Sequence, residues 1–225
     1  MPIYKTKNEN FFKKWSPEMA YILGFFAADG SMIKNKRGAH FIEFQITDKE
    51  LLEEIKKLLG SNHKISILNK NTKWKTAYRL QIGSKKIFND LLLLGITQNK
   101  SKKIKLPKIP EKYLCHFVRG YFDGDGNVTF GYFKKSDRTK KSPAIITRFT
   151  SGSKDILEEL KLTLTNSLDT KGSLFFSKNN AWQLSYSAND SQKLFKFMYI
   201  GRNNNKNIIY LERKYKIFLK AGCDL

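Results

Sequence analysis

Two aspartates, Asp29 and Asp125, stand at matching places in two similar segments, residues 16–32 and 110–128. Each follows a largely apolar run and precedes a glycine. If the segments lie side by side, the two carboxylates meet, and each raises the pKa of the other. A divalent cation relieves that repulsion, because carboxylate and carbonyl oxygens suit Mg²⁺ and Mn²⁺. Such a pair could hold a water nucleophile and a phosphate, which is the chemistry of phosphodiester cleavage.

The two segments are predicted to be helices that pack closely on each other. Ser16 is a good N-cap, Pro17 suits the first helical position, and Gly30 can end the helix. Pro110 is expected to open the second segment in the same way. Residues four apart lie on one side of a helix, and a face of small residues lets two backbones approach. The small residues at this spacing are Ala20, Gly24 and Ala28 in the first segment and Gly120 and Gly124 in the second.

The crossing should place the metal ligands. We expect the cation at Asp29, Asp125 and the residues before them, Ala28 and Gly124. For one copy alone, Asp-Gly is more simply a turn that closes a helix. Its repetition behind matching small-residue faces favours the metal site. Asp123 has Ala27 as its counterpart, so we interpret it as a helix-end or interface residue.

The rest of the chain repeats in the same order, although the motif segments are offset by 96 residues and the second copy carries extra residues in its loop around 134–141. In each half a strand pattern precedes an amphipathic helix pattern, at 41–59 and again at 145–164. Residues 78–95 then match residues 182–201. The order in each half is helix, strands, helix, strands, helix, which predicts an α+β fold. We place the halves at residues 1–107 and 108–225, with a short basic linker at 101–110.

Composition points to an anionic partner. Lys and Arg number 42 against 20 Asp and Glu, for a formal net charge of +22. Nucleic acid is the expected partner, because its phosphates bind cationic side chains with release of counterions. An AT-rich genome, which favours Lys and Asn codons, would produce part of the same bias. The only cysteines, Cys115 and Cys223, give no zinc pattern. The longest apolar run is too short for a membrane span and no signal peptide is evident, so we expect a soluble, intracellular protein.

Residues 22–30 and 118–126 resemble the LAGLIDADG motif, and residues 10–220 resemble a single-chain, two-motif LAGLIDADG homing endonuclease. The resemblance implies two αββαββα halves with pseudo-two-fold symmetry, whose antiparallel sheets form a saddle over double-stranded DNA. It implies a monomer that cuts both strands of a long asymmetric target and leaves 3′ overhangs. It implies Mg²⁺ as cofactor, with Mn²⁺ substituting and Ca²⁺ supporting binding without cleavage. Such proteins occur in a prokaryotic cytoplasm or an organelle, and intron RNA is a possible further partner.

The resemblance also implies further site residues. Asp48 stands where the family often has a glutamine that positions a water, and Ser153 stands at the matching place in the second half. The family carries a lysine near the end of each half that polarises the site. Lys100 fits this role in the first half, while Lys214 and Lys206 both fit it in the second.

Polar residues on the strands are the expected DNA readers. Alternate residues of a strand face the same side, where Arg and Lys suit guanine and Asn and Gln suit adenine. Because the halves differ here, the target should be asymmetric, although any one of these residues could lie on an ordinary solvated face. In the first half the candidates are Lys34, Lys36, Arg37, Glu43, Gln45, Asn69, Lys73, Lys75, Arg79 and Gln81. In the second half they are Thr129, Lys134, Lys135, Arg138, Arg148, Thr150, Ser177, Asn179 and Gln183.

Two other classes of protein could share this pattern. A non-cleaving intron RNA maturase or DNA-binding regulator on the same fold is the main alternative, and retention of both aspartates and a lysine disfavours it. An intein is disfavoured because the chain begins Met-Pro and ends Cys-Asp-Leu, without an initiating Cys or a terminal His-Asn pair.

Overall fold

The computed structural model describes residues 5–68, 75–134, 139–200 and 208–223, and these form two halves with one element order. The first half consists of α1 (Pro17–Asp29), β1 (Gly30–Lys34), β2 (His40–Ile46), α2 (Lys49–Leu58), β3 (Ile65–Ile67), β4 (Tyr78–Gly83), α3 (Lys85–Leu93) and the short 3₁₀ helix η1 (Lys100–Lys102). The second consists of the 3₁₀ helix η2 (Glu111–Tyr113), α4 (Leu114–Asp125), β5 (Gly126–Phe133), β6 (Ser142–Ser151), α5 (Lys154–Leu168), β7 (Ser173–Phe176), β8 (Trp182–Tyr186), α6 (Ala188–Met198) and α7 (Glu212–Lys220).

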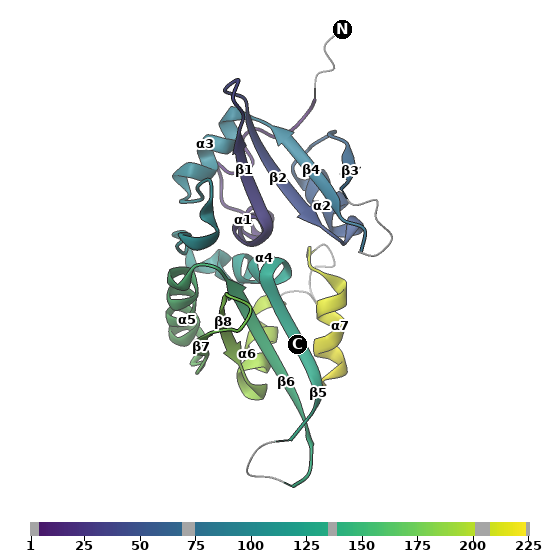
Figure 1. Cartoon of the computed structure of the whole chain (residues 1–225), viewed down its shortest axis with the longest axis vertical. Coiled ribbons are helices and arrows are strands. Elements are labelled where there is room, and N and C mark those ends of the chain that lie inside the picture. Colours follow the sequence, from purple (N-terminus) through teal and green to yellow (C-terminus); the bar gives the residue numbers. More distant parts are fainter. Residues whose placement is uncertain (1–4, 69–74, 135–138, 201–207, 224–225) are drawn as a thin grey trace.

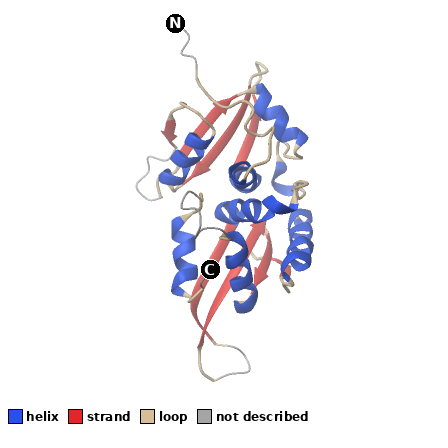
Figure 2. Cartoon of the chain, turned by 180° about the vertical axis from the view of Figure 1, so that it is seen from behind, coloured by secondary structure: helices blue, strands red, loops and turns tan. Residues whose placement is uncertain are grey.

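Each half has one four-stranded antiparallel sheet. The strand orders, β1-β2-β4-β3 and β5-β6-β8-β7, are the same order in the two copies. Both sheets lie on one side of the molecule (Figure 1), and the helices cover the other side, as the view from behind shows (Figure 2). The predicted α+β fold with two αββαββα halves is therefore confirmed, with α7 added after the second copy.

The two motif helices begin differently. At α1 the Ser16 hydroxyl accepts a hydrogen bond from the Met19 N–H at 3.1 Å, and Pro17 opens the helix as expected. In the second half Pro110 instead precedes the 3₁₀ turn η2, and α4 starts only at Leu114. The prediction that Pro110 opens an α-helix was wrong, because the chain first makes one tighter turn.

The cores of the halves repeat the same aromatic packing. Phe44 of β2 and Phe26 of α1 pack edge to face with ring centroids 5.1 Å apart. Phe149 of β6 meets Phe122 of α4 in the same manner at 5.8 Å. Each motif helix thus packs its large side chains on its own sheet, which leaves its small residues for the other helix.

No helix among the described residues combines the length and apolar character that crossing a membrane requires.

Candidate active site at the helix crossing

Helices α1 and α4 cross through two glycines. A Cβ added at Gly24 would lie 2.1 Å from the carbonyl oxygen of Phe117, and one at Gly120 would lie 2.0 Å from that of Tyr21. These two contacts are related by the 96-residue offset, so the crossing follows the internal symmetry. Both distances are far below a van der Waals contact, so any side chain here would push the helices apart.

The crossing brings Asp29 and Asp125 close together. One carboxylate oxygen of Asp29 lies 3.4 Å from the place that a Cβ on Gly124 would take, one residue before Asp125. The Asp29 side chain reaches solvent, but the groups crowded around its carboxylate reduce its solvation, and this effect and then the negative charge of Asp125 raise the pKa of Asp29 to about 6. Burial also raises the pKa of Asp125, although Lys100 and Lys214 oppose that rise. Two carboxylates with raised pKa values at one point form a site that a cation would stabilise.

The donor set fits an oxygen-ligated divalent ion. Among the described residues, no group of three or more His, Cys, Asp or Glu could hold a metal, so the site rests on two carboxylates and nearby carbonyls. The carbonyl oxygens of Ala28 and Gly124 accept hydrogen bonds from Lys100 and Lys214 at 3.0 and 3.3 Å. A carbonyl oxygen has two lone pairs, so each keeps one for a further ligand. Mg²⁺ typically binds few protein ligands and keeps water molecules in its remaining coordination positions.

Two buried lysines hold the ends of the motif helices. Lys100 donates to the carbonyl oxygens of Ala27 and Ala28. Lys214 donates to the carbonyls of the two matching residues, Asp123 and Gly124, and also contacts the Phe122 and Gly126 carbonyls at 2.6 Å each. Burial lowers the pKa of Lys100, and it lowers that of Lys214 to about 8. Lys214 thus occupies the place in the second half that Lys100 has in the first, while Lys206 lies outside the described residues.

Asp123 ties the second motif helix to the rest of the site. Its carboxylate is buried and accepts hydrogen bonds from the Tyr21 hydroxyl of α1 and the Leu211 N–H before α7, both at 2.8 Å. Burial raises the pKa of Asp123 to about 6, against the opposing charge of Lys214. Asp123 thus lies at the interface of the halves, beside the segment that carries Lys214.

Asp48 lies at the start of α2 and pairs with the other half. The Arg213 guanidinium approaches both Asp48 carboxylate oxygens at 3.2 and 3.3 Å. The positive charge of Arg213 also opposes the rise in the pKa of Asp29, after the larger effects of Lys214 and Lys100, which indicates that Arg213 lies near the aspartates. Sequence reasoning missed Arg213, because nothing distinguishes it among 42 basic residues. Ser153, the counterpart of Asp48, is buried and donates to the Ile104 carbonyl at 2.8 Å. Its hydroxyl is thus hydrogen-bonded to the linker between the halves.

The structure places the expected DNA readers differently. On the central strands the side chains opposite the buried core alternate outward, and these are Glu43, Gln45, Arg79, Gln81, Arg148, Thr150 and Gln183. The turns and strand ends hold Lys36, Arg37, Lys75, Lys134, Ser177 and Asn179, while Thr129 lies within β5. Lys34 stands two residues after the buried Met32 and therefore on the same side of β1, so it does not share the outer face of that strand. Asn69, Lys73, Lys135 and Arg138 lie outside the described residues.

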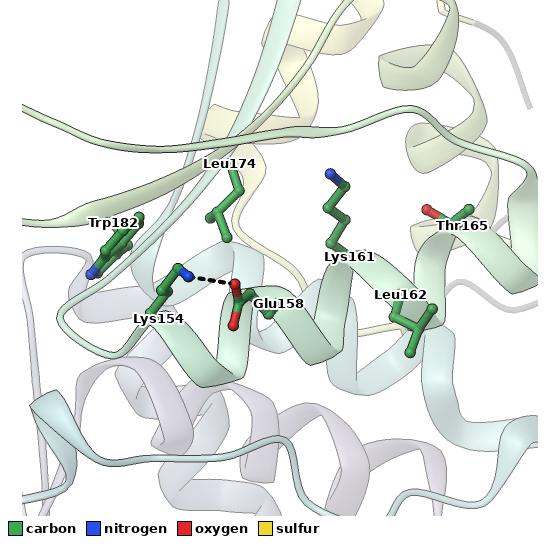
Figure 3. Close-up of a pocket in the computed structure, with 7 residues that line it drawn as sticks. All are labelled: Lys154, Glu158, Lys161, Leu162, Thr165, Leu174 and Trp182. Carbon is green, nitrogen blue, oxygen red and sulfur yellow. Dashed lines mark ion pairs between the residues drawn. The ribbon is translucent and has the colours of Figure 1, made fainter.

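A surface groove of the second half is separate from this site. Figure 3 shows it between α5 and the strands β7 and β8, with an ion pair of 2.7 Å between Lys154 and Glu158. A groove between Lys49 and Ile65 occupies the corresponding place in the first half. Neither groove is lined by the helix ends that carry the aspartates.

Comparison with known proteins places the duplication in a family. The model of the LAGLIDADG-like domain matches residues 16–95 and again 112–208. Uncharacterized protein MJ0398 of Methanocaldococcus jannaschii is 31% identical over 118 residues, which are 51% of this chain and 40% of that protein. The chain spans 13% to 62% of the length of the curated relatives that it matches.

Solved structures share the fold at low sequence identity. The LAGLIDADG meganuclease I-AabMI, bound to uncleaved DNA, superposes with a TM-score of 0.63 at 17% identity, over 92% of this chain and 89% of that one. I-SmaMI, bound to an uncleaved DNA target in the presence of calcium ions, superposes with a TM-score of 0.56 at 15% identity, over 93% and 98%.

Proposed function

Because this chain belongs to the LAGLIDADG family, we propose that it is a site-specific homing endonuclease acting as a monomer inside the cell. It binds a long asymmetric duplex on the outer faces of its two sheets. It hydrolyses both strands to leave 3′ overhangs. The observation that carries the proposal is the meeting of Asp29 and Asp125, one from each half, at a crossing that only glycines permit.

The roles follow the contacts at the crossing. Asp29 and Asp125 hold the divalent cation, with the Ala28 and Gly124 carbonyls as further oxygen donors. Mg²⁺ is the proposed ion and Mn²⁺ substitutes, because both take oxygen ligands. The ion would supply Lewis-acid activation of the phosphate and of a water molecule.

The remaining site residues act around that centre. Lys100 and Lys214 hold the ends of both helices and place positive charge beside the phosphate position. Asp48 orients a water on the first-half side, and Arg213 fixes its carboxylate. The second half has Ser153 in place of such a carboxylate. The two DNA strands therefore lie beside different side chains at the two cleavage positions.

The net charge of +22 supplies the affinity for phosphates. In the first half the proposed contacts are Lys36, Arg37, Gln45, Lys73, Lys75, Arg79 and Gln81, without Lys34, which does not share the outer face of β1. In the second half they are Lys134, Lys135, Arg138, Arg148, Asn179 and Gln183.

The test begins with DNA selection. The protein is incubated with a randomised duplex library in Ca²⁺, which we expect to support binding without cleavage, and the enriched sequence is cloned into a plasmid. With Mg²⁺ the wild type should linearise that plasmid. Asp29→Asn and Asp125→Asn should bind the sequence and leave it uncut. Asp169→Asn is the matched control, because its exposed aspartate already has the left-handed backbone that asparagine tolerates.

Two results would overturn the proposal. Enrichment of a sequence that the wild type binds but never cuts would favour the non-cleaving maturase or regulator. Undiminished cutting by either aspartate variant would show that the replaced carboxylate is not required for the reaction.

A further inference from the structure

The central strands of the two sheets carry opposite charges at one matching position. Gly30 pairs with Phe44 in the first sheet, and Gly126 pairs with Phe149 in the second. The residue before each phenylalanine is therefore equivalent, and it is Glu43 in β2 and Arg148 in β6. Both lie at the end of the sheet that adjoins the aspartates.

The neighbours of these residues differ as well. Glu43 lies between Ser31 and Gln81 on the adjoining strands. Arg148 lies between Asn127 and Ser185. We call these two cross-strand sets the first row and the second row. The rows are equivalent in backbone register and different in every side chain.

Glu43 is a buried acid on a face that points away from the core. Its neighbours Ile42 and Phe44 are fully buried on the core side, so Glu43 lies on the outer side, yet it is only 4% exposed. Its cover consists of other polar side chains. Gln45 donates from its amide nitrogen to one carboxylate oxygen at 2.5 Å, and Gln81 donates to the other at 2.9 Å.

That arrangement decides what the first row offers a ligand. An ionised carboxylate only accepts hydrogen bonds, so both amides must turn their NH₂ groups toward Glu43. The carbonyl oxygen of each amide is therefore the atom left to accept a hydrogen bond from a ligand. Gln45 is exposed there and Gln81 is half-buried. Together with Gln45, the next outward residue of β2, the first row thus offers acceptors held in place by a buried acid.

The second row offers donors. Arg148 is half-buried on the outer side of β6, between the buried core residues Thr147 and Phe149. Among the described residues, no hydrogen bond or ion pair engages its guanidinium. A free guanidinium has donors in a fork geometry that matches guanine O6 and N7, whereas acceptors match the amino groups of adenine and cytosine.

We propose that the two rows read opposite base-edge chemistry, with Arg148 selecting guanine in one half-site and the Glu43-anchored amides selecting an amino-bearing base at the symmetry-related position of the other. The inference rests on the proposed function, since it presumes that the outer faces lie in the major groove. The Arg79 guanidinium also approaches a Glu43 carboxylate oxygen at 3.9 Å, so this acid draws a cation as well as the two amides toward itself. Glu43 is the positioning residue here, and Gln45 and Gln81 make the contact.

The test compares sequences enriched from a randomised duplex library in Ca²⁺. Arg148→Glu should lower the preference for guanine at one position by about tenfold or more. Glu43→Arg should make guanine preferred at the symmetry-related position. The double variant keeps the wild-type net charge and should move the guanine from one half-site to the other. Glu158→Arg is the control, because it makes the same charge change as Glu43→Arg on the exposed face of α5, and it should leave the consensus unchanged.

Glu43→Gln guards against a folding defect, because it is nearly the same shape and volume. It should relax discrimination at the first-row position alone, while thermal melting and the second-row guanine stay as in the wild type. A wild-type consensus that none of the row variants alters would overturn the inference and leave the proposed function standing. Changes spread equally over both half-sites would also overturn it. A wild type that enriches no sequence would overturn both.

Discussion

The crowding of Asp29 and Asp125 should destabilise the metal-free protein, and Asp29→Asn should relieve it. The folded-state pKa of Asp29 is about 6, against 3.8 for an ordinary aspartate side chain. A group whose pKa is raised by folding contributes stability that is present below its unfolded pKa and is lost as pH rises through its folded pKa. The wild type should therefore lose this contribution between about pH 4 and 6, whereas the neutral asparagine does not titrate.

The magnitude follows from that shift. About 2 pKa units correspond to roughly 3 kcal/mol if nothing screens the repulsion. The Asp29 side chain is exposed to solvent, however, although charged and apolar groups crowd around it. Water therefore screens much of the repulsion, and we expect about 1 kcal/mol to remain. In a chain of 225 residues that is about 2–4 °C in Tm.

The assay is thermal and urea unfolding in EDTA at pH 7.5 and near pH 4. Asp29→Asn should be the more stable protein at pH 7.5, and the two proteins should converge near pH 4. Mg²⁺ should then stabilise the wild type more than the variant, because a ligand stabilises the state that binds it. A variant that is equal or less stable than the wild type at pH 7.5 would refute the reasoning, and Asp169→Asn should show no such pH-dependent gain.

Three further predictions concern the crossing and the DNA surface. Gly24→Ala should destabilise the protein by about 1–3 kcal/mol in urea unfolding, because its Cβ would lie 2.1 Å from a backbone oxygen, whereas Gly131→Ala meets only ordinary contacts at 3.6 Å. Lys214→Met should stop plasmid cutting and lower stability by about 2 kcal/mol, since buried carbonyls lose their donor, while the exposed Lys216→Met should do neither. DNA affinity measured by gel shift should fall steeply with salt, and a flat dependence would contradict the proposed binding surface.

Local patterns predicted the elements of this fold, and the duplication predicted their arrangement. The small residues at Gly24 and Gly120 predicted a helix crossing because their effect depends only on helical periodicity. Strand alternation correctly placed Gln45 and Arg148 on outward faces. Lys34 was wrongly expected on the outer face. Gly30 and Met32 are buried on the core side of β1, and Lys34 follows them at the same two-residue spacing.

These local patterns could not predict which side chains from distant elements come together in the fold. Lys214 and Arg213 are adjacent on α7, yet one is buried against α4 and the other pairs with Asp48 of the opposite half. Their separation depends on how α7 docks, and no periodicity in the chain encodes that. The burial of Glu43 likewise depends on amides from two strands closing over it.

The most direct test of the account is an anomalous scattering map of the protein bound to its selected DNA with Mn²⁺. The account predicts a peak at the helix crossing, within roughly 2.0–2.6 Å of carboxylate oxygens of both Asp29 and Asp125. A map with no peak there, or with the ion held by only one half, would contradict the shared metal site.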